Sequence, residues 1–335
     1  MSVVTRLRAP CALLLASAAC ASIDPAKGHD EVSQLVQART GAATSFAQGR
    51  PEDAQVQAQL DRLLAHGLTP QTAVQIALLS NPQLLATYED LGVSQAELVQ
   101  AGLLSNPKLA FGLGFPLGQS GGGVAFDLSL AQNFLDLFLM PLKKRAARTQ
   151  FDADVLHVAQ ETLAVAAATQ QACAELQAQE RVVELEREAL ETHRLTRDFA
   201  ARLHEAGNTT ELAFATEQAA FEDTSLELGK EELTRVELRE KLDLLLGLSG
   251  RRAEWTLAEP LPELPAADPS LDDLEQAALK QRLDLASLQK RAELQQQALS
   301  LAQDSRAFGL IELGLDLRQD TEGPRLLGPS LTLEL

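Results

Sequence analysis

Residues 108–134 read KLAFGLGFPLGQSGGGVAFDLSLAQNF, and apolar residues alternate there with small or polar ones. Successive side chains of a β-strand point to opposite faces, so each half predicts a strand with one apolar face and one small or polar face. Gly121-Gly122-Gly123 joins the halves as a loop, since no Lys-Ser/Thr pair follows to suggest a phosphate site. The apolar positions, expected to face lipid, are Leu109, Phe111, Leu113, Phe115, Val124, Phe126, Leu128 and Leu130.

A long helix-forming stretch, residues 142–206, follows this strand pair, and Pro141 is the expected junction. About 65 residues at ~1.5 Å each give a helix of roughly 100 Å. Gly207 is expected to end it in a left-handed conformation, and Thr209 or Thr210 to cap a returning helix that ends at Leu246. The sequence therefore predicts an antiparallel helical hairpin over residues 142–247.

Both arms of this hairpin carry apolar residues at seven-residue spacing, which is typical of coiled-coil packing. We therefore expect the two sets to form the seam between the arms. On the first arm they are Leu176, Val183 and Leu190; on the second they are Leu212, Ala219, Leu226 and Leu233. His193 and His204, which lie outside these sets, are expected to be solvated.

The region before the first strand predicts two helices. Residues 20–67 are mostly polar and indicate a leader with one short helix near residues 54–66. Within residues 68–107, Thr69 is a plausible N-cap with Pro70 as the first helical residue, and Asn81-Pro82 separates this helix from a second over residues 83–104. The second helix is expected to stack end to end with the shorter arm of the hairpin.

After the hairpin, the order of elements begins to repeat. Residues 248–270, with several prolines, predict a linker. Residues 271–308 then predict two helices like those of 68–107, and residues 309–335 predict a second strand pair, with Gly328-Pro329 opening its last strand. The second copy of the strands is not followed by a second copy of the long hairpin.

The first 20 residues resemble a bacterial lipoprotein signal. Arg6 and Arg8 precede an apolar run, and Cys20 follows small residues, which predicts cleavage after residue 19 and acylation of Cys20. The alternative is an ordinary cleaved signal with an incidental cysteine. No apolar run reaches the ~18 residues of a transmembrane helix, so a membrane span would have to consist of strands.

The composition supports helices rather than a large globular core. Hydrophobic residues make up 45% of the chain but aromatic residues only 4%, and the formal net charge is −18. That charge argues against a nucleic-acid partner. The five histidines lack metal-ligand spacing, and no Ser-His-Asp or Cys-His set is visible, so we expect no enzyme activity, no cofactor and no metal site.

Four segments in this order resemble the TolC-like outer-membrane efflux proteins. They are LTPQTAVQIALLSNP at 68–82, QAGLLSNP at 100–107, RLHEAGNTTEL at 202–212 and DLLLGL at 243–248. The resemblance implies a mainly α fold with four amphipathic strands per chain in a shared trimeric, twelve-stranded barrel. It also implies an outer-membrane exit duct of a Gram-negative bacterium that works with a periplasmic adaptor (membrane fusion protein) and an inner-membrane pump.

By the same resemblance, the turn at Gly207 is the periplasmic tip where adaptor or pump docks, through Arg202, Gly207, Asn208 and Leu212. Ala213 replaces the acidic residue common in the family, and the alternative is a simple helix-hairpin turn. Relatives carry a second helical hairpin after the second strand pair, so we expect a truncated form. Two other interpretations stay open: a periplasmic coiled-coil scaffold or adaptor lipoprotein, and a non-functional remnant of a duct.

Overall fold

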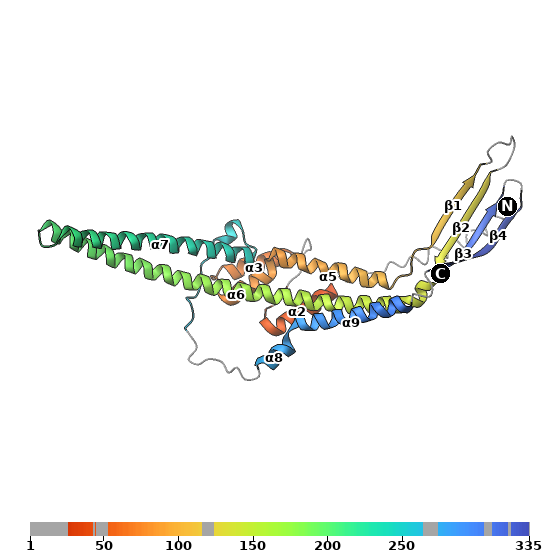
Figure 1. Ribbon diagram of the computed structural model, residues 1–335, viewed down its shortest axis with the longest axis horizontal. Coiled ribbons are helices and arrows are strands. Elements are labelled where there is room, and N and C mark those ends of the chain that lie inside the picture. The colour runs from red at the N-terminus through yellow and green to blue at the C-terminus, as the bar shows by residue number, and fades with distance from the viewer. Residues whose placement is uncertain are drawn as a thin grey trace. The chain divides into compact units, whose positions relative to one another are not determined.

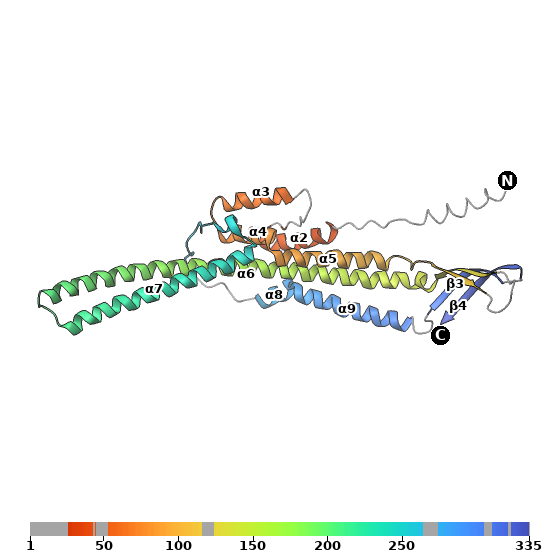
Figure 2. The same ribbon diagram turned by 90° about the horizontal axis from the view of Figure 1, so that it is seen from above.

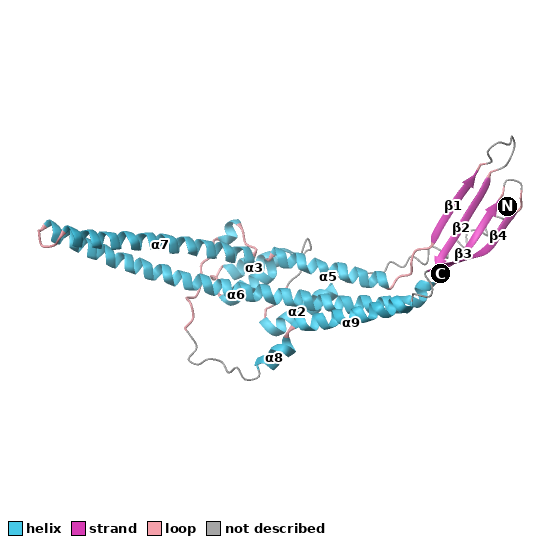
Figure 3. Ribbon diagram, viewed as in Figure 1, coloured by secondary structure: helices cyan, strands magenta, loops and turns pink. Residues whose placement is uncertain are grey.

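The computed structural model describes residues 26–42, 44, 53–115, 124–263, 274–304, 310–320 and 323–334 (Figure 3). The predicted signal segment, Cys20 and the loop at Gly121 to Gly123 lie outside the described residues. The chain divides into two compact units. The sheet unit comprises Met1–Gly28, Asp90–Leu156 and Asp284–Leu335, and the hairpin unit comprises His29–Glu89 and His157–Leu283.

The sheet unit contains one antiparallel sheet of four strands in the order β1-β2-β3-β4 (Figure 1). The strands are β1 (Lys108–Gly114), β2 (Ala125–Asn133), β3 (Leu310–Gln319) and β4 (Arg325–Glu334). The two predicted strand pairs therefore join into a single sheet through β2 and β3. The expectation that Gly328-Pro329 opens the last strand is wrong, because β4 begins at Arg325 and Pro329 pairs with Leu315 inside it. An edge strand tolerates this proline because only one of its sides is hydrogen-bonded.

Helix α6 (Leu135–Glu205) begins before Pro141, which lies inside the helix rather than at its junction with the strands. An internal proline removes one backbone hydrogen bond, but the turn before it is fixed by other contacts. The Leu135 N–H donates to Asn133 Oδ1 at 2.9 Å, and Lys143 Nζ reaches across the proline to Asp136 Oδ1 at 2.7 Å.

Two further helices pack beside the first part of α6 in the sheet unit. Ser94 of α5 (Pro82–Ala101) donates to Asp154 Oδ2 at 2.8 Å. Ser287 of α9 (Leu283–Asp304) donates to the Ala153 carbonyl at 3.0 Å, and Gln297 Nε2 donates to Thr149 Oγ1 at 3.1 Å. Polar contacts thus fix α5 and α9 on this part of α6.

In the hairpin unit, α6 turns back into α7 (Glu211–Leu246), with α2 (Ala26–Thr40), α3 (Asp53–Leu64) and α4 (Pro70–Ser80) near the base of the hairpin (Figure 2). Thr69 caps α4 as predicted, in a capping box with Thr72. The hydrophobic core combines α3, α4, α6 and α7, and its largest buried members include Leu60, Ile76, Leu176, Leu242 and Trp255.

Two segments predicted as a leader and a linker also bury hydrophobic side chains. Helix α2 of the leader was not predicted, and its Val32 and Val36 are fully buried. The predicted linker forms the short 3-10 helix η1 (Gly250–Ala253), buries Trp255 and exchanges backbone hydrogen bonds with Leu68 through Thr256 and Ala258. Helix α8 (Leu274–Gln281) then starts the second repeat, as expected.

The end of α7 meets the start of α5, as the end-to-end arrangement predicts. Ser80 Oγ donates to the Leu246 carbonyl at 2.6 Å, and Asn81 Nδ2 donates to the Leu245 carbonyl at 2.7 Å. Gly247 ends α7 at φ +65°, where an added Cβ would lie 2.1 Å from the Ser80 carbonyl oxygen. Only glycine combines that backbone conformation with so close an approach.

The seam between α6 and α7 differs from the prediction on one side. Leu176 and Val183 of α6 are buried as expected, but on α7 Leu212, Leu226 and Leu233 are 78, 67 and 60% exposed, and Ala219 is exposed as well. The α7 residues turned toward α6 are another seven-residue series, which begins two positions later: Phe214, Phe221, Leu228, Arg235 and Leu242. The predicted period is right, and the predicted face is wrong.

Candidate functional site

The predicted lipid-facing residues of β1 and β2 lie on one face of the sheet. Leu109 pairs with Leu130, Phe111 with Leu128 and Leu113 with Phe126, and directly paired residues share a face. Phe115 and Val124 lie just beyond the last pair of this ladder, and both are exposed. The rows continue across β3 and β4: Leu128 is followed by Leu317 and Leu327, and Leu130 by Leu315 and Pro329.

We call this surface the apolar face. Nothing among the described residues covers most of it: Leu109 is 70%, Phe111 63% and Leu331 60% exposed. A soluble monomer rarely exposes a contiguous apolar patch of this kind, so the surface requires a nonpolar environment or a partner. It ends at the row in which Gln319 pairs with Arg325.

The opposite face of the sheet is mostly small and charged, and Leu326, which pairs with Arg318, is an exposed apolar residue on it. Ala110, Gly112, Ser129 and Gly314 provide little side-chain volume, and the charged residues largely pair across strands. Lys108 Nζ lies 2.6 Å from Glu312 Oε1, and Arg318 Nε lies 3.5 Å from Asp127 Oδ2. These two pairs could not be predicted from local sequence patterns, because they join residues far apart in the chain. This face suits water, and we call it the polar face.

The two edge strands of the sheet are β1 and β4. Within the described residues, β1 pairs only with β2, and β4 only with β3. Unpaired backbone N–H and C=O groups on a sheet edge must find partners, and in lipid no water is available to supply them. In a nonpolar environment, the β1 and β4 edges of the described sheet would therefore need further strands as partners.

The second candidate site is the turn between α6 and α7. Gly207 adopts φ +73°, its N–H donates to the His204 carbonyl at 2.9 Å, and the Asn208 N–H donates to the Leu203 carbonyl at 2.8 Å. This is the Schellman arrangement that closes a helix at glycine. Thr210 then caps α7, accepting from the Ala213 N–H at 3.2 Å.

The predicted docking residues surround this turn. Arg202, Asn208 and Leu212 are exposed, and no atom lies within 4 Å of a Cβ added at Gly207. Within the described structure, no hydrogen bond joins the side chains of Arg202, Asn208 and Leu212 into a pocket. They offer an accessible surface at the end of the hairpin rather than an enclosed site.

His204, expected to be solvated, instead bridges the two arms. Its ring stacks on Phe214 with centroids 5.7 Å apart, and its Nε2 lies 2.9 Å from Glu211 Oε2. Arg197 lies over the Phe221 ring at 4.2 Å in a similar contact about two turns away. The sequence signal for both contacts was the phenylalanine series of α7, seven residues apart, which the leucine series obscured.

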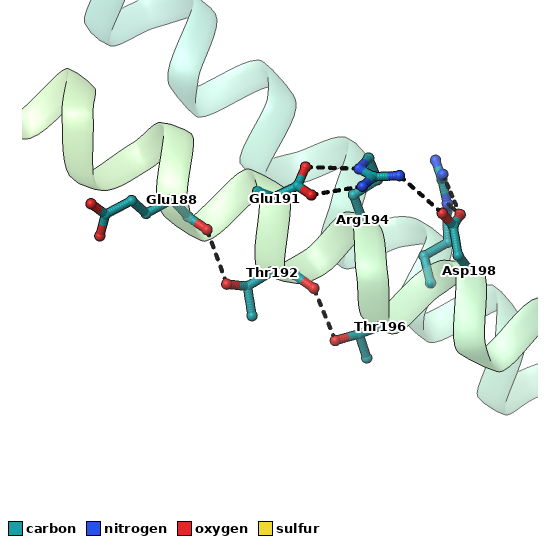
Figure 4. A network of polar contacts seen from close by, with 7 residues as sticks. Glu188, Glu191, Thr192, Arg194, Thr196 and Asp198 are labelled. Atoms are coloured by element: carbon teal, nitrogen blue, oxygen red, sulfur yellow. Dashed lines mark hydrogen bonds and ion pairs between the residues drawn. The ribbon is translucent and has the colours of Figure 1, made fainter.

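A polar network lies on α6 near the tip (Figure 4). Arg194 donates to both carboxylate oxygens of Glu191, at 2.8 and 2.6 Å, and to Asp198 at 3.3 Å. Arg197 also donates to Asp198, and these contacts hold the pKa of that carboxyl below its ordinary value. Exposed pairs of this type contribute little free energy, so the network mainly orients side chains.

A metal site requires several ligating side chains close together. No group of three or more His, Cys, Asp or Glu side chains in them is placed to hold a metal ion. Cys173 is buried, and burial raises the pKa of its thiol. In the part of the chain that the structure describes, no helix is both long and apolar enough to cross a membrane.

Comparison with known proteins supports the fold. No family model matches the chain, and no curated protein matches its sequence. Among solved structures, CusC, studied for folding and transmembrane channel formation, matches with a TM-score of 0.64 and 16% identity over 79% of this chain and 65% of that chain. The chain therefore spans less than two thirds of the length of CusC.

Two outer-membrane proteins match in the same way. The CmeC outer-membrane channel of Campylobacter jejuni has a TM-score of 0.63 and 16% identity over 90% of this chain and 67% of that chain. The outer-membrane protein VceC of Vibrio cholerae has a TM-score of 0.61 and 19% identity over 84% of this chain and 70% of that chain.

Proposed function

We propose that this chain, which has the fold of the TolC-like outer-membrane channels, contributes the wall of an efflux duct through the outer membrane and periplasm. The observation that carries the proposal is the two-faced sheet. Its apolar face is exposed in rows across all four strands, while its polar face pairs Lys108 with Glu312 and Asp127 with Arg318. Strands of a transmembrane barrel need one lipid-facing and one water-facing side.

The open edges at β1 and β4 support closure by further copies of the chain. Three copies would give a barrel of twelve strands. Two copies would give a barrel of eight strands, and side chains would fill most of its interior. A homotrimer is therefore the assembly that leaves a water-filled lumen. In this assembly the apolar face contacts outer-membrane lipid and the polar face lines the duct.

Acylation at Cys20 would anchor the chain to the outer membrane. The turn at Gly207 would be the periplasmic tip, where Arg202, Asn208 and Leu212 meet a periplasmic adaptor or an inner-membrane pump that supplies the energy. The duct itself is passive, without enzyme activity or a cofactor.

Membrane fractionation tests the proposal. The full chain, expressed in a Gram-negative host, should co-sediment with outer membranes and resist extraction by high salt or carbonate. It should run as a trimer on gels when unheated and as a monomer after boiling. A soluble monomer, once any lipid anchor has been removed by a Cys20→Ala substitution, would overturn the duct.

A further inference from the structure

A cluster of basic residues lies just after the sheet, at the start of α6. Residues 143–148 hold Lys143, Lys144, Arg145 and Arg148, and no acidic residue occurs between Asp136 and Asp152. In a chain with a net charge of −18, this local concentration of positive charge is unusual. The cluster belongs wholly to the sheet unit.

Two of these cations have no ion-pair partner among the residues that the structure describes. Lys143 pairs with Asp136 at 2.7 Å, and Arg148 pairs with Asp152 at 2.9 Å. Lys144 and Arg145 are exposed and form no ion pair with any residue that the structure describes. Their charges are thus available to an anion outside the chain.

A partly apolar groove of about 620 Å³ lies beside the basic cluster, between the end of α5 and the start of α6, and Lys143 of the cluster is in its lining. Its lining includes Val99, Leu103, Leu104 and Met140, with Asp136 and Lys143 at its polar part. The aliphatic part of Lys144 lies close to the groove, since a Cβ added to Gly102, between the lining residues Ala101 and Leu103, would be 3.6 Å from Lys144 Cδ. One ligand could therefore touch apolar side chains and a free ammonium group together.

Exposed apolar side chains lie between the strands and the basic cluster. Phe138 is 73% exposed, and Leu137 and Phe134, also in the segment between β2 and Lys143, are exposed as well. Along the chain, the order is a strand with an apolar face, then exposed phenylalanines, then free cations. Proteins use aromatic side chains at the boundary of the hydrocarbon layer and Lys or Arg at the level of the lipid phosphates.

We propose that Lys144 and Arg145, with the groove beside Lys144, bind phospholipids of the periplasmic leaflet of the outer membrane. The phosphate contacts the two free cations, and part of an acyl chain occupies the groove lined by Leu103, Leu104 and Met140. The proposal rests on the proposed membrane-spanning function of the sheet. It adds a site that holds the sheet at a fixed depth in the bilayer.

The test measures lipid retention by the purified full chain in detergent, where insertion into a membrane is not required. Protein in micelles doped with phosphatidylglycerol is transferred to lipid-free detergent, and bound lipid is counted by native mass spectrometry. The Lys144→Gln/Arg145→Gln variant should retain about 25-fold less lipid at low salt, at roughly fivefold per charge. The control Lys280→Gln/Arg291→Gln removes two exposed charges elsewhere and should retain lipid as the unchanged chain does.

Two further arms identify what is bound. Diacylglycerol, which lacks the phosphate, should not be retained, and glycerol phosphate, which lacks acyl chains, should not displace phosphatidylglycerol. Equal lipid retention by the two double variants would overturn the proposal, as would displacement by glycerol phosphate. Failure of the duct would instead appear as absence from outer membranes, which the retention experiment does not measure.

Discussion

Asp243 carries a carboxylate into the core at a cost that its contacts only partly offset. The residue is 6% exposed, and burial raises its pKa above the ordinary value of 3.8. Trp255 Nε1 donates to Asp243 Oδ1 at 2.6 Å, and Arg239, which lies 4.0 Å above the Trp255 ring, also favours the charged form. Because the pKa is raised overall, the folded state binds this proton more tightly than the unfolded state.

The free energy of unfolding should therefore depend on pH through Asp243. The contribution of Asp243 to folding is fully present below pH 3.8 and is lost as the pH rises through the raised pKa. Asp243→Asn keeps the acceptor for Trp255 without the charge, so it should be more stable than the unchanged chain at pH 7 and lack this dependence. Trp255 is the only tryptophan, so its fluorescence during urea unfolding between pH 4 and 8 is a local probe. An Asn variant less stable at pH 7 would refute this account.

Two glycines with similar backbone angles should respond differently to alanine. Gly207 and Gly247 have φ of +73° and +65°, but only at Gly247 would a Cβ meet backbone, 2.1 Å from the Ser80 oxygen. Gly207→Ala should cost about 1 kcal/mol for the left-handed conformation alone. Gly247→Ala should cost about 3 kcal/mol, because overpacking adds to that strain. Urea unfolding of both variants measures the difference, and equal losses would contradict the close approach.

Helix α7 has two seven-residue apolar series, and only one of them packs within the chain. Phe221 lies under Arg197, whereas Leu226 is 67% exposed. In the isolated chain, Phe221→Ala should reduce the free energy of unfolding by about 2 kcal/mol, and Leu226→Ala should change it by less than about 0.5 kcal/mol. Denaturant unfolding followed by circular dichroism checks this pair. A larger loss of unfolding free energy for Leu226→Ala would instead support packing of the leucine series against α6.

The same helix shows where sequence reasoning succeeds and where it stops. Strand alternation identified the faces of β1 and β2 because a period of two leaves one assignment of residues to each face. On α7 both series have the right period, and which one faces α6 depends on the partner helix. The predictions of a junction at Pro141 and of a linker around Trp255 failed for a related reason, since the contacts of Asn133, Asp136 and Leu68 that fix these segments are not visible in local patterns. At the tip, the turn at Gly207 could be predicted, but the bridge from His204 to Glu211 could not.

The net charge of the chain does not show where its charged residues lie. The value of −18 correctly describes a self-repelling, acidic chain. It gives no indication that residues 143–148 form a basic cluster directly after β2, or that charges on the polar face pair across strands. The position of these cations next to the sheet, and not the net charge, is what suggests a role for them.

Membrane insertion of the whole molecule should depend on which face of the sheet carries a charge. Leu128 lies in the row with Phe111, Leu317 and Leu327 on the apolar face, while its neighbour Ser129 lies on the polar face opposite Asp316. Arginine on a lipid-facing position costs about 2–4 kcal/mol near the bilayer midplane. Leu128→Arg should therefore remove most of the chain from outer-membrane fractions, whereas Ser129→Arg, which gains an acidic neighbour and faces water, should leave its membrane level unchanged.

Immunoblots of separated outer membranes, with total expression as reference, compare the two arginine variants. Both substitutions add the same charge to the same strand, so a general loss of folding would affect them alike. If Ser129→Arg were lost and Leu128→Arg retained, the two faces would be assigned the wrong way round. If both were retained as the unchanged chain is, neither face would contact lipid, and the rows of leucine from β1 to β4 would have to be covered by protein instead.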